Sequence, residues 1–206
     1  MTAPSPPGVP EVTLREEGWE PVEESVETLF ESPTMRIRGA TLRYDDVRTR
    51  EALREATDGA LDVPVRFFAA TALGFEPSPP PGVSPTMFAP TLRTEARRAF
   101  AKRLRDRGLR NVEKQGSERV RVGRRTRARF SAFAAEQPLE GLGAGTLPLE
   151  CWVGVWTDGS EVRVVTGGYP AVQLSTHLDI GADVPALTRS QGAAREEFFS
   201  LARAVE

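Results

Sequence analysis

The stretch that decides the fold runs from Leu149 to Pro170 and reads LECWVGVWTDGSEVRVVTGGYP. Valine recurs at alternate positions on both sides of Asp158-Gly159, a dipeptide typical of tight hairpin turns. Alternating side chains point to opposite faces of a strand. The stretch therefore predicts two antiparallel strands, over 149–157 and 160–166, with the valine face turned toward a core.

The opposite face of this hairpin carries Trp152 and Trp156 with Gly154 between them. A two-residue turn at Asp158-Gly159, or a four-residue loop over 157–160, would place Arg163 opposite Gly154. Arg163 would then lie between two indoles, a geometry suited to cation–π contact. Left uncovered, the patch of Trp152, Trp156 and Arg163 would bind a partner, whereas under a helix it would belong to the core.

Flanking segments extend the hairpin into an α+β domain. Apolar residues at helical spacing predict one helix near 92–104, ended by Gly108, and a closing helix near 194–205. A long strand is expected from Glu118 to Ala134. We therefore predict a mostly antiparallel, twisted sheet with packed helices over 19–206, in a single domain. Residues 1–18, Pro-rich and then acidic, are predicted to be a disordered tail.

This order of a long strand, the 149–170 hairpin ending in Gly168-Tyr169-Pro170 and a closing helix resembles the PsbP-like fold. That fold is shared by extrinsic photosystem II subunits and by a nuclear import factor that binds a small GTPase. The resemblance covers the C-terminal third of the chain. It implies a PsbP-like domain that acts as a non-enzymatic binding protein.

The charges of the chain are divided between two regions. Residues 93–129 hold 15 Lys and Arg against 4 acids, a net charge of +11, while the remainder holds 12 against 25, a net charge of −13. The overall charge of −2 hides this division. Arg outnumbers Lys by 25 to 2, a bias that we attribute to the GC-rich coding of a prokaryote.

The centre of the basic region is an arginine stripe. Alternation along the predicted strand places five guanidiniums on one face, at intervals of roughly 6.8 Å: Arg119, Arg121, Arg125, Arg127 and Arg129. The stripe could bind single-stranded nucleic acid or another polyanion, as one continuous positive surface with the helix from Thr94 to Arg107. No aromatic residue for base stacking lies on this face. We therefore expect internal neutralisation by the acidic segment from Glu20 to Glu31.

Residues for catalysis or metal binding are scarce. His177 is the single histidine and Cys151 the single cysteine, which excludes an internal disulfide and a multi-histidine metal site. We expect no catalytic residue, no metal and no cofactor. The N-terminus has no signal-peptide pattern and no apolar run is long enough for a bilayer, so a cytoplasmic location and no membrane partner are expected.

The expected function is a soluble, non-enzymatic binding or protein-interaction module with an unknown protein partner. Two alternatives stay open. One is single-stranded nucleic-acid or polyanion binding through the arginine stripe. The other is a small-molecule carrier, which would have an enclosed apolar pocket of several hundred Å³.

Overall fold

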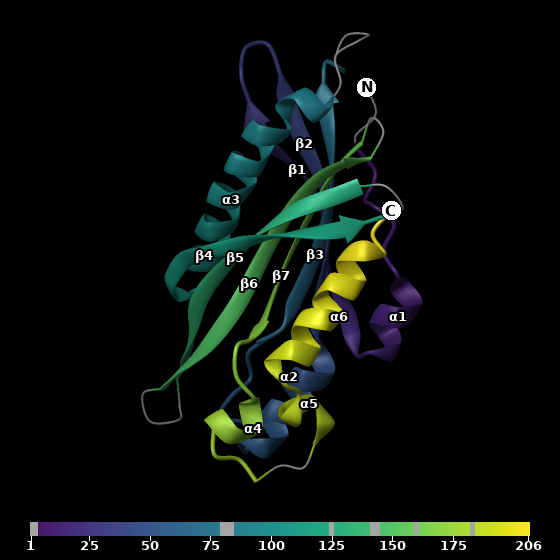
Figure 1. Ribbon diagram of the computed structural model, residues 1–206. Helices are drawn as coiled ribbons and strands as arrows, with labels where there is room; N and C mark the ends of the chain where they lie inside the picture. Colours follow the sequence, from purple (N-terminus) through teal and green to yellow (C-terminus); the bar gives the residue numbers. More distant parts are fainter. Residues whose placement is uncertain (1–3, 79–84, 124–125, 141–144, 159–160, 182–183) are drawn as a thin grey trace.

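A computed structural model of the chain describes residues 4–78, 85–123, 126–140, 145–158, 161–181 and 184–206. These residues form one antiparallel sheet of seven strands in the order β1-β2-β3-β7-β6-β5-β4 (Figure 1). The predicted α+β class with an antiparallel sheet is confirmed. The strands are β1 Trp19–Glu31, β2 Arg36–Asp46, β3 Phe67–Glu76, β4 Arg110–Val122, β5 Thr126–Leu139, β6 Gly145–Asp158 and β7 Glu161–Pro170.

The helices lie between and after these strands. The longest are α3 and α6, and the others are short. Within the described ranges, none of the helices combines the length and hydrophobicity that a bilayer crossing needs. The helices are α1 Glu11–Glu16, α2 Val47–Ala56, α3 Ala89–Asp106, α4 Leu174–His177, α5 Pro185–Thr188 and α6 Gln191–Arg203, with a 3-10 turn, η1, at Pro85–Phe88.

The sheet consists of two antiparallel meanders, β1-β2-β3 and β4-β5-β6-β7, joined where β3 pairs with β7. After β3 the chain passes through α3 to the far edge of the sheet, where β4 begins. The acidic strand β1 and the basic strand β4 therefore lie at opposite edges.

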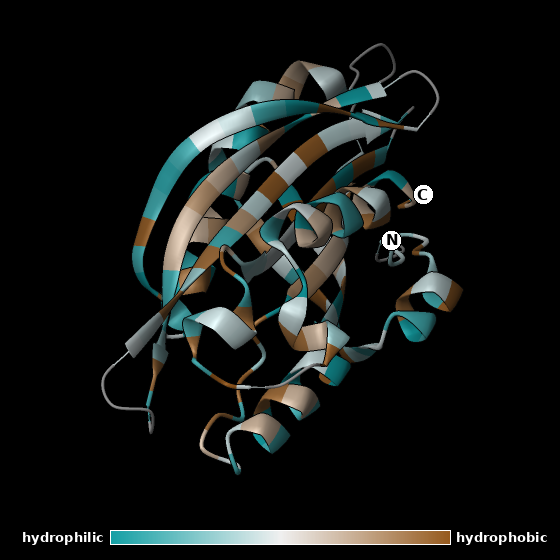
Figure 2. Cartoon of the chain, turned by 60° about the horizontal axis from the view of Figure 1, so that its bottom comes forward, coloured by the Kyte–Doolittle hydropathy of each residue, from teal (hydrophilic) through white to brown (hydrophobic). Residues whose placement is uncertain are grey.

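Both faces of the sheet are covered, because neighbouring strand residues enter different cores. Phe68 and Trp152 pack in the cluster that contains Phe198 of α6. Phe67 and Val153 pack in the cluster that contains Phe100 of α3. Hydrophobic and hydrophilic positions alternate visibly along the strands (Figure 2). The sheet is thus the middle layer between α6 on one face and α2 and α3 on the other.

The N-terminal segment is part of the folded domain. Helix α1 buries Leu14, which is 1% exposed, against the α6 side of the sheet. Gly8 and Glu206 exchange backbone hydrogen bonds of 2.8 and 3.0 Å, which tie the N-terminal segment to the C-terminal end of the chain. The prediction of a disordered tail is therefore wrong for residues 4–18, and residues 1–3 lie outside the described ranges.

The strand predicted from Glu118 to Ala134 is in fact parts of two strands. β4 ends at Val122, Gly123 has a φ of +71°, and β5 begins at Thr126. The two strands pair with Arg121 opposite Arg127. Odd-numbered residues of both strands consequently share a face. Because the same alternation continues through the reversal, the period of two along the sequence does not reveal that the chain turns here.

The terminal hairpin has the predicted faces but a different register. Asp158 pairs with Glu161 and Trp156 with Arg163, so Gly154 lies opposite Val165 rather than Arg163. This is a shift of two residues, which leaves every side chain on its predicted face. The turn residues 159–160 lie outside the described ranges.

Candidate functional site

A basic pocket lies between α3 and the strands β4, β5 and β6. Its volume is about 660 Å³. Ser131, Val153 and Val155 form its buried floor. Six cationic side chains surround this floor, two from α3, two from β4 and two from β5: Arg93, Arg97, Lys114, Arg119, Arg127 and Arg129. We call this site the basic pocket.

Arginines oppose each other across the β4–β5 ladder of this pocket. Arg119 is the direct partner of Arg129, and Arg121 is the direct partner of Arg127. Directly opposed side chains start from Cβ atoms only about 5 Å apart, and like charges at such positions are destabilising. All four arginines are exposed. The sheet edge therefore concentrates positive charge at a cost to its own stability.

Internal neutralisation by the acidic segment, which the sequence led us to expect, is wrong. Glu20 to Glu31 lie on β1, at the other edge of the sheet from the arginines of β4. Glu23 forms an ion pair with Arg43 at 3.0 Å, and Glu31 pairs with Arg36. Within the described ranges, none of the four opposed arginines forms an ion pair with a carboxylate. Arg125, the fifth residue of the stripe, lies outside those ranges.

Hydroxyl groups hold two of the pocket cations in place. Arg97 Nη2 donates a hydrogen bond of 3.0 Å to Thr94 Oγ1, one turn earlier on α3. Arg129 Nε donates one of 3.0 Å to Ser117 Oγ on β4. Both hydroxyl residues also line the pocket, as does Ser131. These contacts fix two guanidiniums that line the pocket, and they leave the positive charges without a neutralising partner.

The lining of the basic pocket is chemically uniform. The described lining residues supply guanidinium and ammonium donors, three hydroxyls, a proline and two valines, and include no carboxylate, imidazole or thiol. Such a set binds anions by charge-assisted hydrogen bonds. No group of three His, Cys, Asp or Glu within the described ranges could hold a metal ion.

The Trp patch predicted from the hairpin is core rather than surface. Trp152 and Trp156 are 4% and 6% exposed and belong to the core cluster that contains Phe198 and Phe199 of α6. The ring centroids of Trp152 and Phe199 are 5.1 Å apart. Arg163 forms its ion pair with Glu161 on its own strand. The cation that lies over Trp152 is Arg195 of α6, 5.5 Å from the ring centroid. The predicted binding patch of Trp152, Trp156 and Arg163 is therefore wrong as an exposed site.

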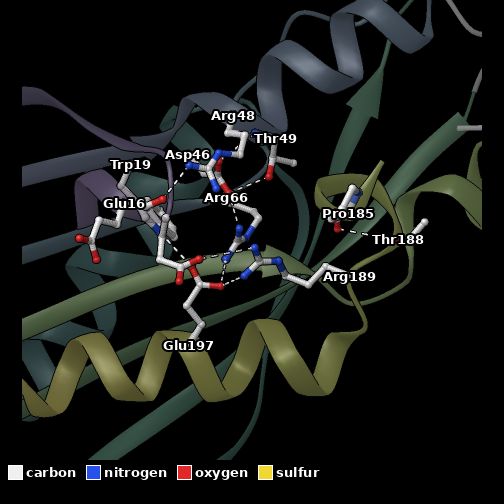
Figure 3. A network of polar contacts seen from close by, with 11 residues as sticks. Glu16, Trp19, Asp46, Arg48, Thr49, Arg66, Pro185, Thr188, Arg189 and Glu197 are labelled. Atoms are coloured by element: carbon white, nitrogen blue, oxygen red, sulfur yellow. Dashed lines mark hydrogen bonds and ion pairs between the residues drawn. The ribbon is translucent and has the colours of Figure 1, made fainter. Parts of the chain in front are cut away.

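A second polar cluster is buried beside α6 (Figure 3). Arg66, 3% exposed, donates to Asp46 at the end of β2 and, at 2.6 Å, to Glu197 of α6. Trp19 Nε1 donates to the same Glu197 carboxylate at 2.9 Å, and Arg189 pairs with it. The cluster joins four segments that are distant in sequence. Its carboxylates are already occupied by these partners, so we assign it to stability.

The surroundings of His177 and Cys151 indicate structural roles for both side chains. His177 is exposed and its Nε2 is 2.8 Å from the carbonyl oxygen of Thr146. Cys151 is fully buried between β5 and β7, and burial raises the pKa of its thiol to about 12. A thiol held in its protonated form is a poor nucleophile.

Sequence reasoning found three of the four strand cations of the basic pocket and placed the helix from Thr94 to Arg107 beside them, but it singled out neither Arg93 nor Arg97. Arg93 and Arg97 are four residues apart and therefore share a face of α3. This spacing was the available signal. Lys114 enters the same face through the register shift between Lys114 and Gly116, which the sequence did not reveal.

The fold and the pocket define an α+β protein with a helix-covered antiparallel sheet and a basic pocket at one edge. The chain belongs to the family described as Domain of unknown function (DUF6517), whose match covers residues 6–206. Neither a curated protein nor a solved structure matches the chain significantly.

Proposed function

We propose that the chain is a binding protein whose basic pocket takes an anionic ligand. The observation that carries this proposal is two pairs of directly opposed arginines across β4 and β5, Arg119 with Arg129 and Arg121 with Arg127, without a carboxylate partner in the described structure. Three of these arginines, Arg119, Arg127 and Arg129, line the pocket. An anion placed between them would replace repulsion by charge-assisted hydrogen bonds. This proposal develops the polyanion-binding alternative, with Arg119, Arg127 and Arg129 of the arginine stripe at the pocket.

The proposed function is ligand binding without catalysis. A general base, a nucleophile or a metal ligand would need an imidazole, thiol or carboxylate at the cavity, and the described lining supplies donors instead. The pocket volume of about 660 Å³ is in the range of small-molecule sites. Its cationic lining supports an anionic ligand over the apolar cargo of a carrier.

Thermal unfolding in the presence of multivalent anions tests this function. A ligand at 100 times its Kd stabilises the folded state by about 2.7 kcal/mol, which for a chain of this size raises Tm by about 5–10 °C. We expect such a rise with at least one multivalent anion and its loss in the double variant Arg119→Glu/Arg129→Glu. No rise with any anion, or a rise that persists in the double variant, would overturn the proposal.

A protein partner is a second proposal, supported by the edge strand β1. Val22, Val26, Leu29 and Phe30 are between 41% and 47% exposed, and glutamates lie between them. An extended partner segment with alternating basic and apolar residues would complement this edge by strand addition. A peptide of alternating Lys and Val should then shift the NMR amide signals of β1. Unchanged β1 signals would contradict this second proposal.

We also propose that the fold is PsbP-like. The antiparallel sheet between helical layers and the closing helix α6 after the β6–β7 hairpin support the resemblance. Members of that fold generally bind partners without catalysis, in agreement with the proposed function. Superposition of an experimental structure of this chain on PsbP-like domains would test it, and a different strand order would refute it.

A further inference from the structure

The basic pocket presents its cations as a compact cluster rather than as a line. The β4–β5 reversal places Arg119 of β4 directly beside Arg129 of β5, and both line the pocket together with Arg127. Arg93 and Arg97 of α3 close the pocket on another side. Charges therefore reach the cavity from three elements. An extended polymer would leave most of them without a contact, whereas a small, densely charged molecule would reach them together.

The charge of the lining sets the charge of the occupant. Six cationic side chains and no carboxylate line the described pocket. A phosphate monoester carries about −1.5 to −2 at pH 7, so about three to four phosphate groups balance six cations. The planar fork of arginine matches phosphate oxygens in a bidentate manner, and five of the six cations are arginines.

Part of the lining is already arranged for such a ligand. Arg97 and Arg129 are held by Thr94 Oγ1 and Ser117 Oγ, each at 3.0 Å, so fewer rotamers are lost when an anion binds. Ser131, 5% exposed, adds a hydroxyl at the floor. These hydroxyls complement phosphate oxygens or the neutral hydroxyls of a polyol.

The described lining contains no aromatic ring. Single-stranded nucleic acids are bound mainly by stacking of bases on aromatic side chains along a positively charged groove. Val153 and Val155 offer a small aliphatic floor instead of a stacking platform. The lining therefore favours the phosphates of a small molecule over the bases of a polynucleotide.

We infer that the basic pocket binds a compact small molecule that carries at least about three to four phosphate groups close together. This inference rests on the proposed function, because it names the class of anion for the same site. The arginines that repel each other across β4 and β5 would bind the same ligand. Helix α3 would form a wall of the pocket that favours compact ligands over extended ones.

Isothermal titration calorimetry of the full chain at about 0.15 M salt tests the inference. The compact probe is inositol hexakisphosphate, the small probe is pyrophosphate, and the polymeric probe is a 20-nucleotide oligo-dT. We expect one molecule of inositol hexakisphosphate per chain, with an affinity at least about tenfold above those of pyrophosphate and of oligo-dT, because only this probe reaches most of the six cations at once.

A matched pair of variants locates the site. Arg97 faces the basic pocket, whereas Arg98, the next residue of α3, is exposed and pairs with Glu95. Both Arg97→Glu and Arg98→Glu change the charge of the chain by the same amount. We expect Arg97→Glu to weaken the binding of inositol hexakisphosphate at least about tenfold and Arg98→Glu to change it less than about threefold, because only Arg97 contacts the ligand.

The outcomes separate the inference from the proposed function. Oligo-dT or pyrophosphate binding as tightly as inositol hexakisphosphate, with the same dependence on Arg97, would overturn the inference and leave anion binding at the pocket intact. Equal losses in Arg97→Glu and Arg98→Glu would show attraction to the whole basic surface and overturn the assigned pocket. The absence of binding by every probe would overturn the inference and the proposed function together.

Discussion

Arg127→Glu should make the protein more stable while it weakens binding at the proposed ligand site. Arg127 lies opposite Arg121 in the β4–β5 ladder and forms no ion pair in the described structure. Loss of the like-charge pair and gain of an opposite-charge pair contribute about 0.2–1 kcal/mol each, hence about 0.4–2 kcal/mol in total. For a chain of 206 residues this raises Tm by about 1–8 °C.

Differential scanning calorimetry at low and high salt measures this effect. Screening shortens the Debye length from about 10 Å at 0.1 M to about 3 Å at 1 M salt, so the gain in Tm should shrink in 1 M salt. Arg127→Gln removes the repulsion without adding an attraction and should show about half of the gain. The same glutamate variant should bind inositol hexakisphosphate more weakly than the wild type.

Two results would refute this reasoning. A Tm of Arg127→Glu at or below that of the wild type at low salt would mean that the opposed arginines do not repel each other appreciably. A gain that is equal at 0.1 M and 1 M salt would assign the effect to packing or backbone preference rather than to charge.

Three further changes test the rest of the structure. Gly154→Ala should lower the free energy of unfolding by about 1–3 kcal/mol, measured by urea denaturation, because the added Cβ would overlap the ring of Phe130. An unchanged midpoint would contradict this packing. Arg66→Ala should lower the free energy of unfolding, measured in the same way, by about 3–5 kcal/mol, because two carboxylates lose their buried partner. A loss below about 1 kcal/mol would contradict the stabilising role of the buried polar cluster. Cys151 should resist iodoacetamide at pH 8 in the folded protein, since burial raises the pKa of its thiol to about 12. It should react once urea unfolds the chain. Rapid labelling of the folded protein, measured by mass spectrometry, would refute the burial.

The proposed binding site would place function in conflict with stability. Native sheets commonly place opposite charges across from each other, and this edge does the reverse at two successive pairs. A stability cost retained at a pocket is typical of a binding site, where the ligand supplies the missing interaction.

The sequence by itself determined which face each strand residue occupies. Alternation placed the odd-numbered arginines on one face, with Val120 and Phe130 on the other, and this division holds in β4 and β5. The apolar spacing also predicted α3 and α6, and Gly108, with a φ of +86°, follows the end of α3. These features are local, since periods of 2 and 3.6 residues are properties of single elements.

Tertiary structure alone decided which faces and edges meet. The pairing of β3 with β7 put β1 and β4 at opposite edges, which separated the glutamates of β1 from the arginines of β4. Local patterns carry no information on the order of strands in a sheet. A reversal or a register shift by an even number of residues leaves the period of two unchanged, so alternation could detect neither the turn after Val122 nor the partner of Arg163. The basic pocket arose because α3 crosses to the far edge of the sheet and adds Arg93 and Arg97 to the cations of β4 and β5.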